Sequence, residues 1–126
     1  MQLRDVIGPE VATIPPGTHL SEAAQKMNAL NVNMLPVCDG RTLIGVLTAR
    51  DLTVRATSAG CDPWTATVRD VMTREVIYAR DDQDVHAAAR LMERYRLTSL
   101  PVLNECGQLV GIVTWGNLRN ALKARE

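Results

Sequence analysis

Apolar residues near the start of the chain recur at every third or fourth position, the spacing of one face of a helix. This pattern predicts a helix over residues 18–31, preceded by a short helical lead-in over residues 3–7. The predicted buried stripe of the longer helix consists of Leu20, Ala23, Ala24, Met27 and Leu30. The polar residues between these positions are expected to face solvent.

Runs of branched apolar residues flank this helix and predict strands that alternate with it. The expected strands span residues 11–14, 34–38 and 43–47. The Asp39-Gly40 pair predicts a hairpin turn between the last two strands, and a second helix is expected over residues 50–58. Because a helix joins the first two strands, these should lie parallel, with a right-handed crossover.

The whole pattern occurs twice along the chain. Leu20 corresponds to Val85, and the same offset places Leu35-Pro36-Val37 on Leu100-Pro101-Val102. A copy of about 60 residues is marginal alone, because a chain that short buries too little of its surface. We therefore expect an α+β fold of two tandem β-α-β-β-α motifs, residues 1–60 and 61–126, packed sheet-to-sheet about a pseudo-twofold axis with grooves between them.

The composition limits the core, the partners and the location. Aromatic residues make up 3 % of the chain and Phe is absent, so the core must consist of aliphatic side chains and Met. The 14 basic and 14 acidic residues balance, so nucleic acid and membranes are not expected partners, and any anion binding must be local. We find no signal peptide and no apolar run of transmembrane length, which predicts a cytoplasmic protein.

The three cysteines, Cys38, Cys61 and Cys106, are odd in number and have no CxxC spacing. This usage favours reduced thiols over a disulfide framework, although pairing of two of them stays open. Cys38 is expected on a strand and unreactive, whereas Cys106 is expected to be exposed on the second hairpin turn.

One motif ends the third strand of each copy and begins the helix that follows. It reads Gly45-Val46-Leu47-Thr48-Ala49-Arg50-Asp51 in the first copy and Gly111-Ile112-Val113-Thr114-Trp115-Gly116-Asn117 in the second. Thr48 and Asp51 place a hydroxyl, a carboxylate and free helix N–H groups in one corner, which could hold ribose hydroxyls and a phosphate. The same two residues also form a common helix start signal, so both interpretations stay open.

The duplicated pattern of Ala-Ala-x-x-Met, Leu-Pro-Val and Gly-hydrophobic-hydrophobic-Thr-x-x-Asp resembles a tandem pair of cystathionine-β-synthase (CBS) domains, also called a Bateman module. The resemblance covers residues 3–122 and extends to small stand-alone bacterial two-CBS proteins. It implies a regulatory module that senses AMP, ADP, ATP or S-adenosylmethionine in the cleft between the repeats. The alternative is a protein–protein interaction module whose degenerate nucleotide sites bind nothing.

The resemblance also implies which residues would contact an adenosine ligand. Adenine would lie against Ala12, Thr13, Met34, Leu35 and Pro36 in the first copy, or Ile77, Tyr78, Ser99, Leu100 and Pro101 in the second. Ribose and phosphate would be held by Thr48, Arg50 and Asp51, or by Thr114 and Asn117. A carboxylate can accept from both ribose hydroxyls and an amide cannot. We therefore expect one nucleotide per chain, held at Asp51 and Thr48, although Met34 could narrow that pocket.

Catalytic and metal-binding constellations are not visible in the sequence. His19 and His86 have no Cys or second His at metal-ligand spacing, and neither a Gly-rich phosphate loop nor a Ser–His–Asp order is present. We therefore expect no enzyme activity, no cofactor and no metal. The resemblance implies a homodimer formed by the outer helices, with Met27 and Met92 as contacts unless they pack in the core, and an effector protein that the sequence does not identify.

Overall fold

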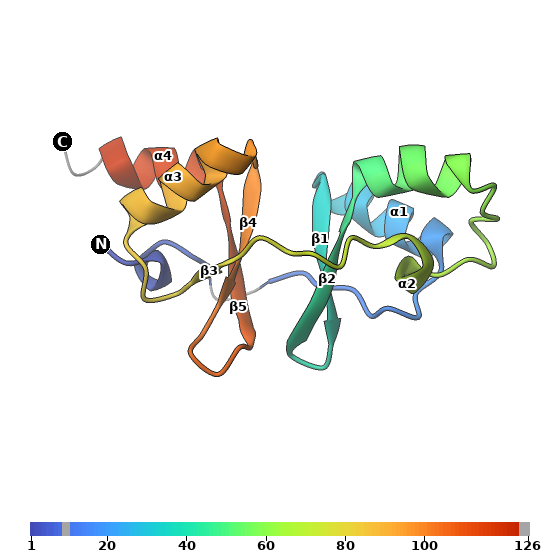
Figure 1. Cartoon of the computed structure of the whole chain (residues 1–126), viewed down its shortest axis with the longest axis horizontal. Coiled ribbons are helices and arrows are strands. Elements are labelled where there is room, and N and C mark those ends of the chain that lie inside the picture. Colours follow the sequence, from blue (N-terminus) through green and yellow to red (C-terminus); the bar gives the residue numbers. More distant parts are fainter. Residues whose placement is uncertain (9–10, 124–126) are drawn as a thin grey trace. The chain divides into compact units, whose positions relative to one another are not determined.

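The computed structural model describes residues 1–8 and 11–123, which form two compact units (Figure 1). The first-repeat unit spans Ala12–Val76, and the second-repeat unit combines Met1–Val11 with Ile77–Glu126. In the part of the chain that is described, every helix is too short or too polar to cross a bilayer.

The first-repeat unit contains a helix, a hairpin and a second helix in the predicted order. Helix α1 (Leu20–Leu30) leads to strands β1 (Met34–Asp39) and β2 (Thr42–Thr48), which pair antiparallel. The helix after β2 runs over residues 49–58, and its segment η2 (Asp51–Ala56) has π geometry. A single-turn π segment inside a helix is frequently found at functional sites. Helix α2 (Val68–Val71) completes the unit.

The second-repeat unit repeats this arrangement with one more regular strand. It contains η1 (Leu3–Asp5), β3 (Ala79–Arg80), α3 (Val85–Tyr95), β4 (Ser99–Leu103), β5 (Leu109–Thr114) and α4 (Trp115–Lys123). Strand β3 pairs parallel with β4, and β4 pairs antiparallel with β5. The Asp84 carboxylate begins α3 by accepting a 2.8 Å hydrogen bond from the His86 N–H group. The parallel first pair confirms the predicted parallel orientation.

The first predicted strand, over residues 11–14, is reduced to a single parallel bridge between Ile14 and Val37. The Ile14 N–H group donates to the Pro36 carbonyl at 3.0 Å, and the Ile14 carbonyl accepts from the Cys38 N–H group at 3.1 Å. Pro15 follows immediately, and because proline has no N–H group it cannot extend the ladder. The orientation was therefore predicted correctly and the length was not.

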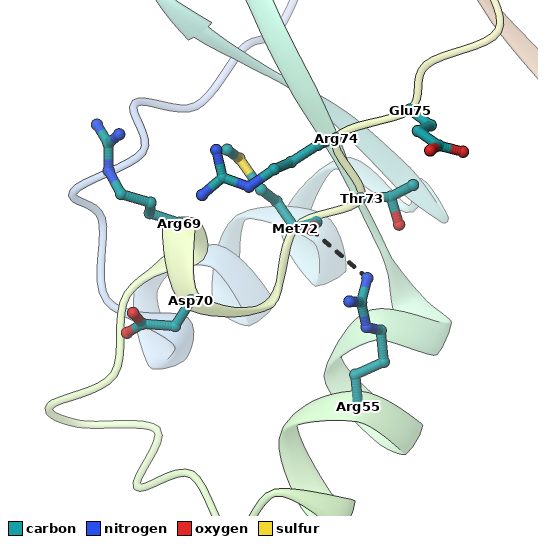
Figure 2. A pocket seen from close by; sticks show the side chains of 7 residues that line it. All are labelled: Arg55, Arg69, Asp70, Met72, Thr73, Arg74 and Glu75. Atoms are coloured by element: carbon teal, nitrogen blue, oxygen red, sulfur yellow. Dashed lines mark hydrogen bonds between the residues drawn. The ribbon is translucent and has the colours of Figure 1, made fainter.

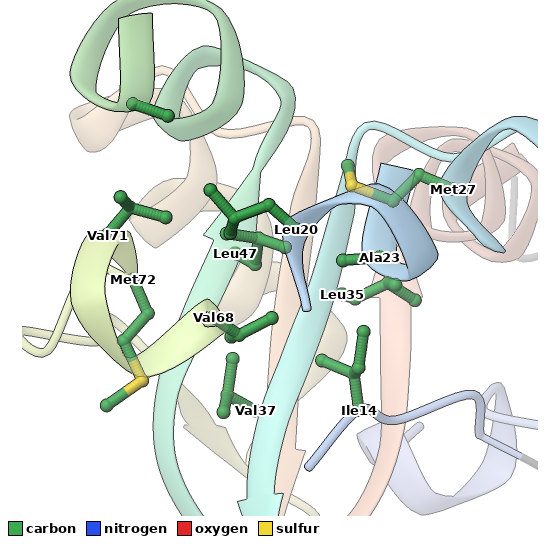
Figure 3. Packing of buried hydrophobic residues seen from close by; sticks show 11 residues of the cluster. Ile14, Leu20, Ala23, Met27, Leu35, Val37, Leu47, Val68, Val71 and Met72 are labelled. Atoms are coloured by element: carbon green, nitrogen blue, oxygen red, sulfur yellow. The ribbon is translucent and has the colours of Figure 1, made fainter. Parts of the chain in front are cut away.

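The lead-in segment of each repeat packs into the core of the other repeat. Leu3 is fully buried in the core of the second-repeat unit. Val68 and Met72 are buried in the core of the first-repeat unit with Leu20 and Leu47 (Figure 3). The compact units therefore do not follow the boundary between the sequence repeats at residues 60 and 61.

The predicted buried stripe of α1 is only partly buried. Leu20, Ala23 and Met27 lie in the core, whereas Ala24 and Leu30 are exposed. Met92 is 1 % exposed and Met27 5 %, which confirms core packing, the alternative given for both residues, over the dimer contact.

Helix α1 is also shorter than the predicted range of residues 18–31. The Thr18 carbonyl accepts a 2.8 Å hydrogen bond from the Val68 N–H group of the lead-in to the second repeat. Asn31 adopts the left-handed conformation that ends the helix, with a φ of 54°.

Candidate functional site

The glycine of the repeated motif allows a close backbone approach. A Cβ atom on Gly45 would lie 2.8 Å from the Thr73 carbonyl oxygen and 3.0 Å from the Met72 sulfur. The Val46 N–H group donates to the Thr73 carbonyl at 2.9 Å, and the Thr73 N–H group donates to the Val46 carbonyl at 2.9 Å. The segment after α2 is therefore fixed along β2, beside the end of the strand where the corner begins.

The Thr48–Asp51 corner forms a reciprocal cap at the start of the helix. The Thr48 N–H group donates to the Asp51 carboxylate at 2.9 Å, and the Asp51 N–H group donates to the Thr48 hydroxyl at 3.1 Å. Each side chain thus satisfies a backbone donor that would otherwise lack a partner. The helix start signal is confirmed in the first copy.

Asp51 also has partners outside this cap. It is 3 % exposed and is the only buried charged residue among residues 1–8 and 11–123. The Thr73 hydroxyl donates to both carboxylate oxygens, at 3.1 and 3.3 Å, and the Arg55 Nη1 atom lies 3.6 Å from Oδ1. Because buried charges are stable only when paired and hydrogen-bonded, these contacts explain how the carboxylate remains in the core.

The corner of the second copy is open. Thr114 and Asn117 are both exposed. The Thr114 hydroxyl donates to the Asn117 amide oxygen at 2.8 Å, and the Asn117 N–H group donates back to that hydroxyl at 3.1 Å. The residue that corresponds to Thr73 in the repeat is Gly8, which has no side chain to reach the corner. The hydroxyl–carboxylate pair of the first copy is thus replaced by an amide and a glycine.

The residues expected to contact adenine in the first copy lie beside the corner. Met34 is directly opposite Thr48 in the β1–β2 ladder, so the two side chains share a face of the hairpin. Met34 is half-buried, whereas Leu35 and Pro36 are buried. Leu35 is 1 % exposed, and its side chain belongs to the core of the first-repeat unit.

The other expected contacts of the first copy are more open. Ala12 is exposed and Thr13 is half-buried; the Thr13 carbonyl accepts from the Lys26 ammonium at 2.6 Å. Arg50, the expected phosphate contact, is exposed on the first turn of the helix.

The second copy has the same cross-strand arrangement. Ser99 lies opposite Thr114 in the β4–β5 ladder and is half-buried. Leu100 and Pro101 are buried, so here too the side chains belong to the core. Ile77 is half-buried and Tyr78 is 50 % exposed, just before β3. Each expected set of residues therefore lies within a single compact unit.

A cavity of about 390 Å³ adjoins the first corner within the first-repeat unit (Figure 2). It is lined by Arg55, Arg69, Asp70, Met72, Thr73, Arg74 and Glu75. Two of these residues, Arg55 and Thr73, are the ones that contact Asp51. None of the residues expected from the sequence lines this cavity.

Thr73 and Arg55 are the site residues that sequence reasoning missed. Arg55 follows Asp51 by four residues, the spacing of a helical ion pair, so its signal was present in the sequence. Thr73 is distant from Asp51 in the sequence. The sequence indicates their contact only in that both positions differ in the other repeat, where Asn117 and Gly8 correspond to them.

Potential metal ligands and the three cysteines are the remaining candidate groups. Among residues 1–8 and 11–123 no three His, Cys, Asp or Glu side chains are grouped as metal ligands would be. Cys38 is buried on β1 and Cys106 is exposed on the second hairpin turn, as predicted, and Cys61 is half-buried. Burial raises the pKa of the Cys38 thiol.

Two comparisons with known proteins place the sequence in a family. The CBS domain family matches residues 3–56 and 68–124. The CBS domain-containing protein YhcV of Bacillus subtilis is 34 % identical over 116 residues, covering 92 % of this chain and 81 % of that protein. Inosine-5'-monophosphate dehydrogenase of Methanocaldococcus jannaschii is 32 % identical over 123 residues, but the chain, of which 97 % aligns, spans only 23 % of that protein.

Solved structures of CBS pairs have the same fold. The domain pair of MJ0100, crystallised with 5'-methylthioadenosine and S-adenosyl-L-methionine, superposes with a TM-score of 0.83 at 27 % identity, covering 100 % of this chain and 98 % of that one. CBSX2 of Arabidopsis thaliana, crystallised with AMP, superposes with a TM-score of 0.83 at 29 % identity, covering 99 % and 98 %. The repeats, the α+β topology and these matches show that the chain belongs to the CBS domain family, as a tandem pair of CBS repeats.

Proposed function

We propose that this chain is a cytoplasmic regulatory module that binds an adenosine-containing nucleotide at the Thr48–Asp51 corner. Related CBS pairs have been crystallised with AMP or with S-adenosyl-L-methionine and 5'-methylthioadenosine, which supports this ligand class. One observation carries the choice of corner: the only buried carboxylate of residues 1–8 and 11–123 contacts the lining of a cavity of about 390 Å³. Small-molecule sites commonly have volumes of about 300–1,000 Å³.

Binding at this corner requires an exchange of hydrogen bonds. The Thr73 hydroxyl occupies both oxygens of the Asp51 carboxylate. A ribose diol would replace this one donor with two, so the carboxylate would stay satisfied in the bound state. The first-copy site is thus closed by a side chain that the ligand can replace.

The second corner is the other candidate, and its exposure favours it. Thr114 and Asn117 have no bonds to displace from another element in the described part of the chain. Asp51→Asn and Asn117→Ala distinguish the two corners, because the amide introduced by Asp51→Asn would retain an acceptor for the helix cap. If the first corner binds the ligand, Asp51→Asn should weaken AMP binding about tenfold or more, as expected for loss of a charged hydrogen bond, and Asn117→Ala should leave it unchanged.

A thermal-shift screen with AMP, ADP, ATP, 5'-methylthioadenosine and S-adenosylmethionine tests the function itself. A ligand at 100 times its dissociation constant should add about 2.7 kcal/mol to the stability of the folded state. If none of these compounds raises the melting temperature, the interaction-module alternative is favoured and the nucleotide hypothesis fails.

We also propose that the chain forms a homodimer and acts on an effector protein. Leu30 on α1 and Val54 on η2 are 46 % and 47 % exposed, which supports an apolar contact on these outer helices. Light scattering at micromolar concentration should give twice the chain mass, and a monomer would contradict the dimer.

A further inference from the structure

We propose that the ligand of the first corner carries phosphate, and that Arg55, Arg69 and Arg74 bind this phosphate in the adjoining cavity. This inference rests on the proposed function. It narrows the ligand class to nucleotides such as AMP, ADP or ATP, and it disfavours the uncharged 5'-methylthioadenosine and the cationic sulfonium of S-adenosylmethionine.

The three guanidinium groups come from different elements of the first-repeat unit. Arg55 extends from η2, Arg69 from α2, and Arg74 from the segment that follows α2 (Figure 2). Arg55 is held weakly, because its Nη1 atom lies 3.6 Å from Asp51 and 3.5 Å from the Met72 carbonyl. Hydrogen bonds of this kind are normally about 2.7–3.2 Å long, so little energy opposes a turn of Arg55 toward an anion.

Two of the three arginines that line this cavity form no ion pair with any described residue, whereas Arg55 is paired with Asp51. Arg69 and Arg74 are exposed, and neither has an acidic partner within 4.0 Å in the described part of the chain. The Asp70 carboxylate is occupied at the start of α2, where it accepts from the Thr67 N–H group at 2.8 Å. Figure 2 shows the Glu75 carboxylate extending away from the Arg74 guanidinium. The lining thus has three guanidinium groups against two carboxylates, an excess of positive charge in a chain whose net charge is zero.

Guanidinium groups suit a phosphate because their planar forks can donate two parallel hydrogen bonds to its oxygens. Arg55 lines the proposed phosphate cavity and also contacts Asp51, the proposed ribose contact. A phosphate that attracts Arg55 removes one partner from Asp51, and the freed carboxylate can then accept a ribose hydroxyl. Phosphate binding and ribose binding should therefore reinforce each other at this site.

Calorimetric titration of the full chain with AMP, adenosine and inorganic pyrophosphate tests the inference. Arg69→Gln and Arg74→Gln remove charge from the cavity without touching Asp51. Arg41→Gln is the matched control, because Arg41 is an exposed residue of the β1–β2 turn that does not line the cavity. We expect each cavity variant to weaken AMP binding about tenfold, equivalent to about 1.4 kcal/mol, and Arg41→Gln to leave it unchanged.

The choice of ligands separates this inference from the proposed function. AMP should bind more tightly than adenosine, and the cavity variants should leave adenosine binding unchanged. Pyrophosphate binding that is lost in Arg74→Gln supports the anion site even if no nucleoside binds. If adenosine and AMP bind equally, or S-adenosylmethionine binds more tightly than AMP, the inference is overturned while the adenosine-binding function stands.

Discussion

Replacing Asp51 with alanine should destabilise the protein far more than the equivalent change in the second repeat. Asp51→Ala removes a helix cap and a buried acceptor of the Thr73 hydroxyl. Asn117→Ala removes an exposed cap alone. The two repeats therefore provide an internal control, because both corners make the same backbone cap bonds and their environments differ.

The magnitude follows from the contacts that each variant loses. A helix cap contributes about 1 kcal/mol, and a hydrogen bond to a charged group contributes about 1.5–3 kcal/mol. The Arg55 pair adds roughly 0.3–0.5 kcal/mol, because the arginine side chain is 55 % exposed and solvent screens the pair. We expect Asp51→Ala to lower the free energy of unfolding by about 3–4 kcal/mol, and Asn117→Ala by about 1 kcal/mol or less.

Urea denaturation followed by circular dichroism measures both changes. A double-mutant cycle with Thr73→Val isolates the hydroxyl–carboxylate contact, because valine keeps the shape and the backbone bonds of Thr73. The coupling between positions 51 and 73 should be about 1.5–3 kcal/mol. Equal losses for Asp51→Ala and Asn117→Ala, or a coupling near zero, would refute the view that Thr73 and Asp51 stabilise the first-repeat unit together.

Local packing and burial lead to three further predictions. Gly45→Ala should destabilise the protein by about 1–3 kcal/mol in urea unfolding, because its Cβ would meet a backbone carbonyl, whereas Gly17→Ala, with nothing within 4 Å, should not. Because burial raises the pKa of Cys38, native protein at about pH 8 should be alkylated at Cys106 and not at Cys38. Because the pKa of Cys38 is higher in the folded than in the unfolded protein, the free energy of unfolding should fall as the pH rises from the ordinary thiol pKa toward that of folded Cys38. A free energy of unfolding that does not change over this pH range would contradict the shift.

Periodic and local signals predicted most of the elements. The hairpin at Asp39-Gly40 and the parallel pairing of the first strands were predicted correctly, because a turn pair and a helix that joins two strands can both be recognised from short stretches of sequence. The position of the lead-in segments was not predicted, because a repeat in sequence does not show which copy a short apolar segment packs against. Val68 and Leu3 would have fitted either core by size and polarity.

The candidate site was predicted only in part. The Thr48–Asp51 corner follows from residues three positions apart, so sequence reasoning identified it. Thr73 reaches Asp51 only because the Val46–Thr73 bridge brings two distant segments together, and no local pattern encodes that contact. Thr73 and its neighbours Met72 and Arg74 line the cavity beside the corner, and no local pattern in the sequence places them there.

Titration of AMP into the unmodified chain, followed by isothermal calorimetry, tests the central claim most directly. The account predicts saturable binding with one nucleotide per chain, and tighter binding of AMP than of adenosine. Absence of any heat with AMP, ADP, ATP, 5'-methylthioadenosine and S-adenosylmethionine at concentrations up to the millimolar range would contradict it.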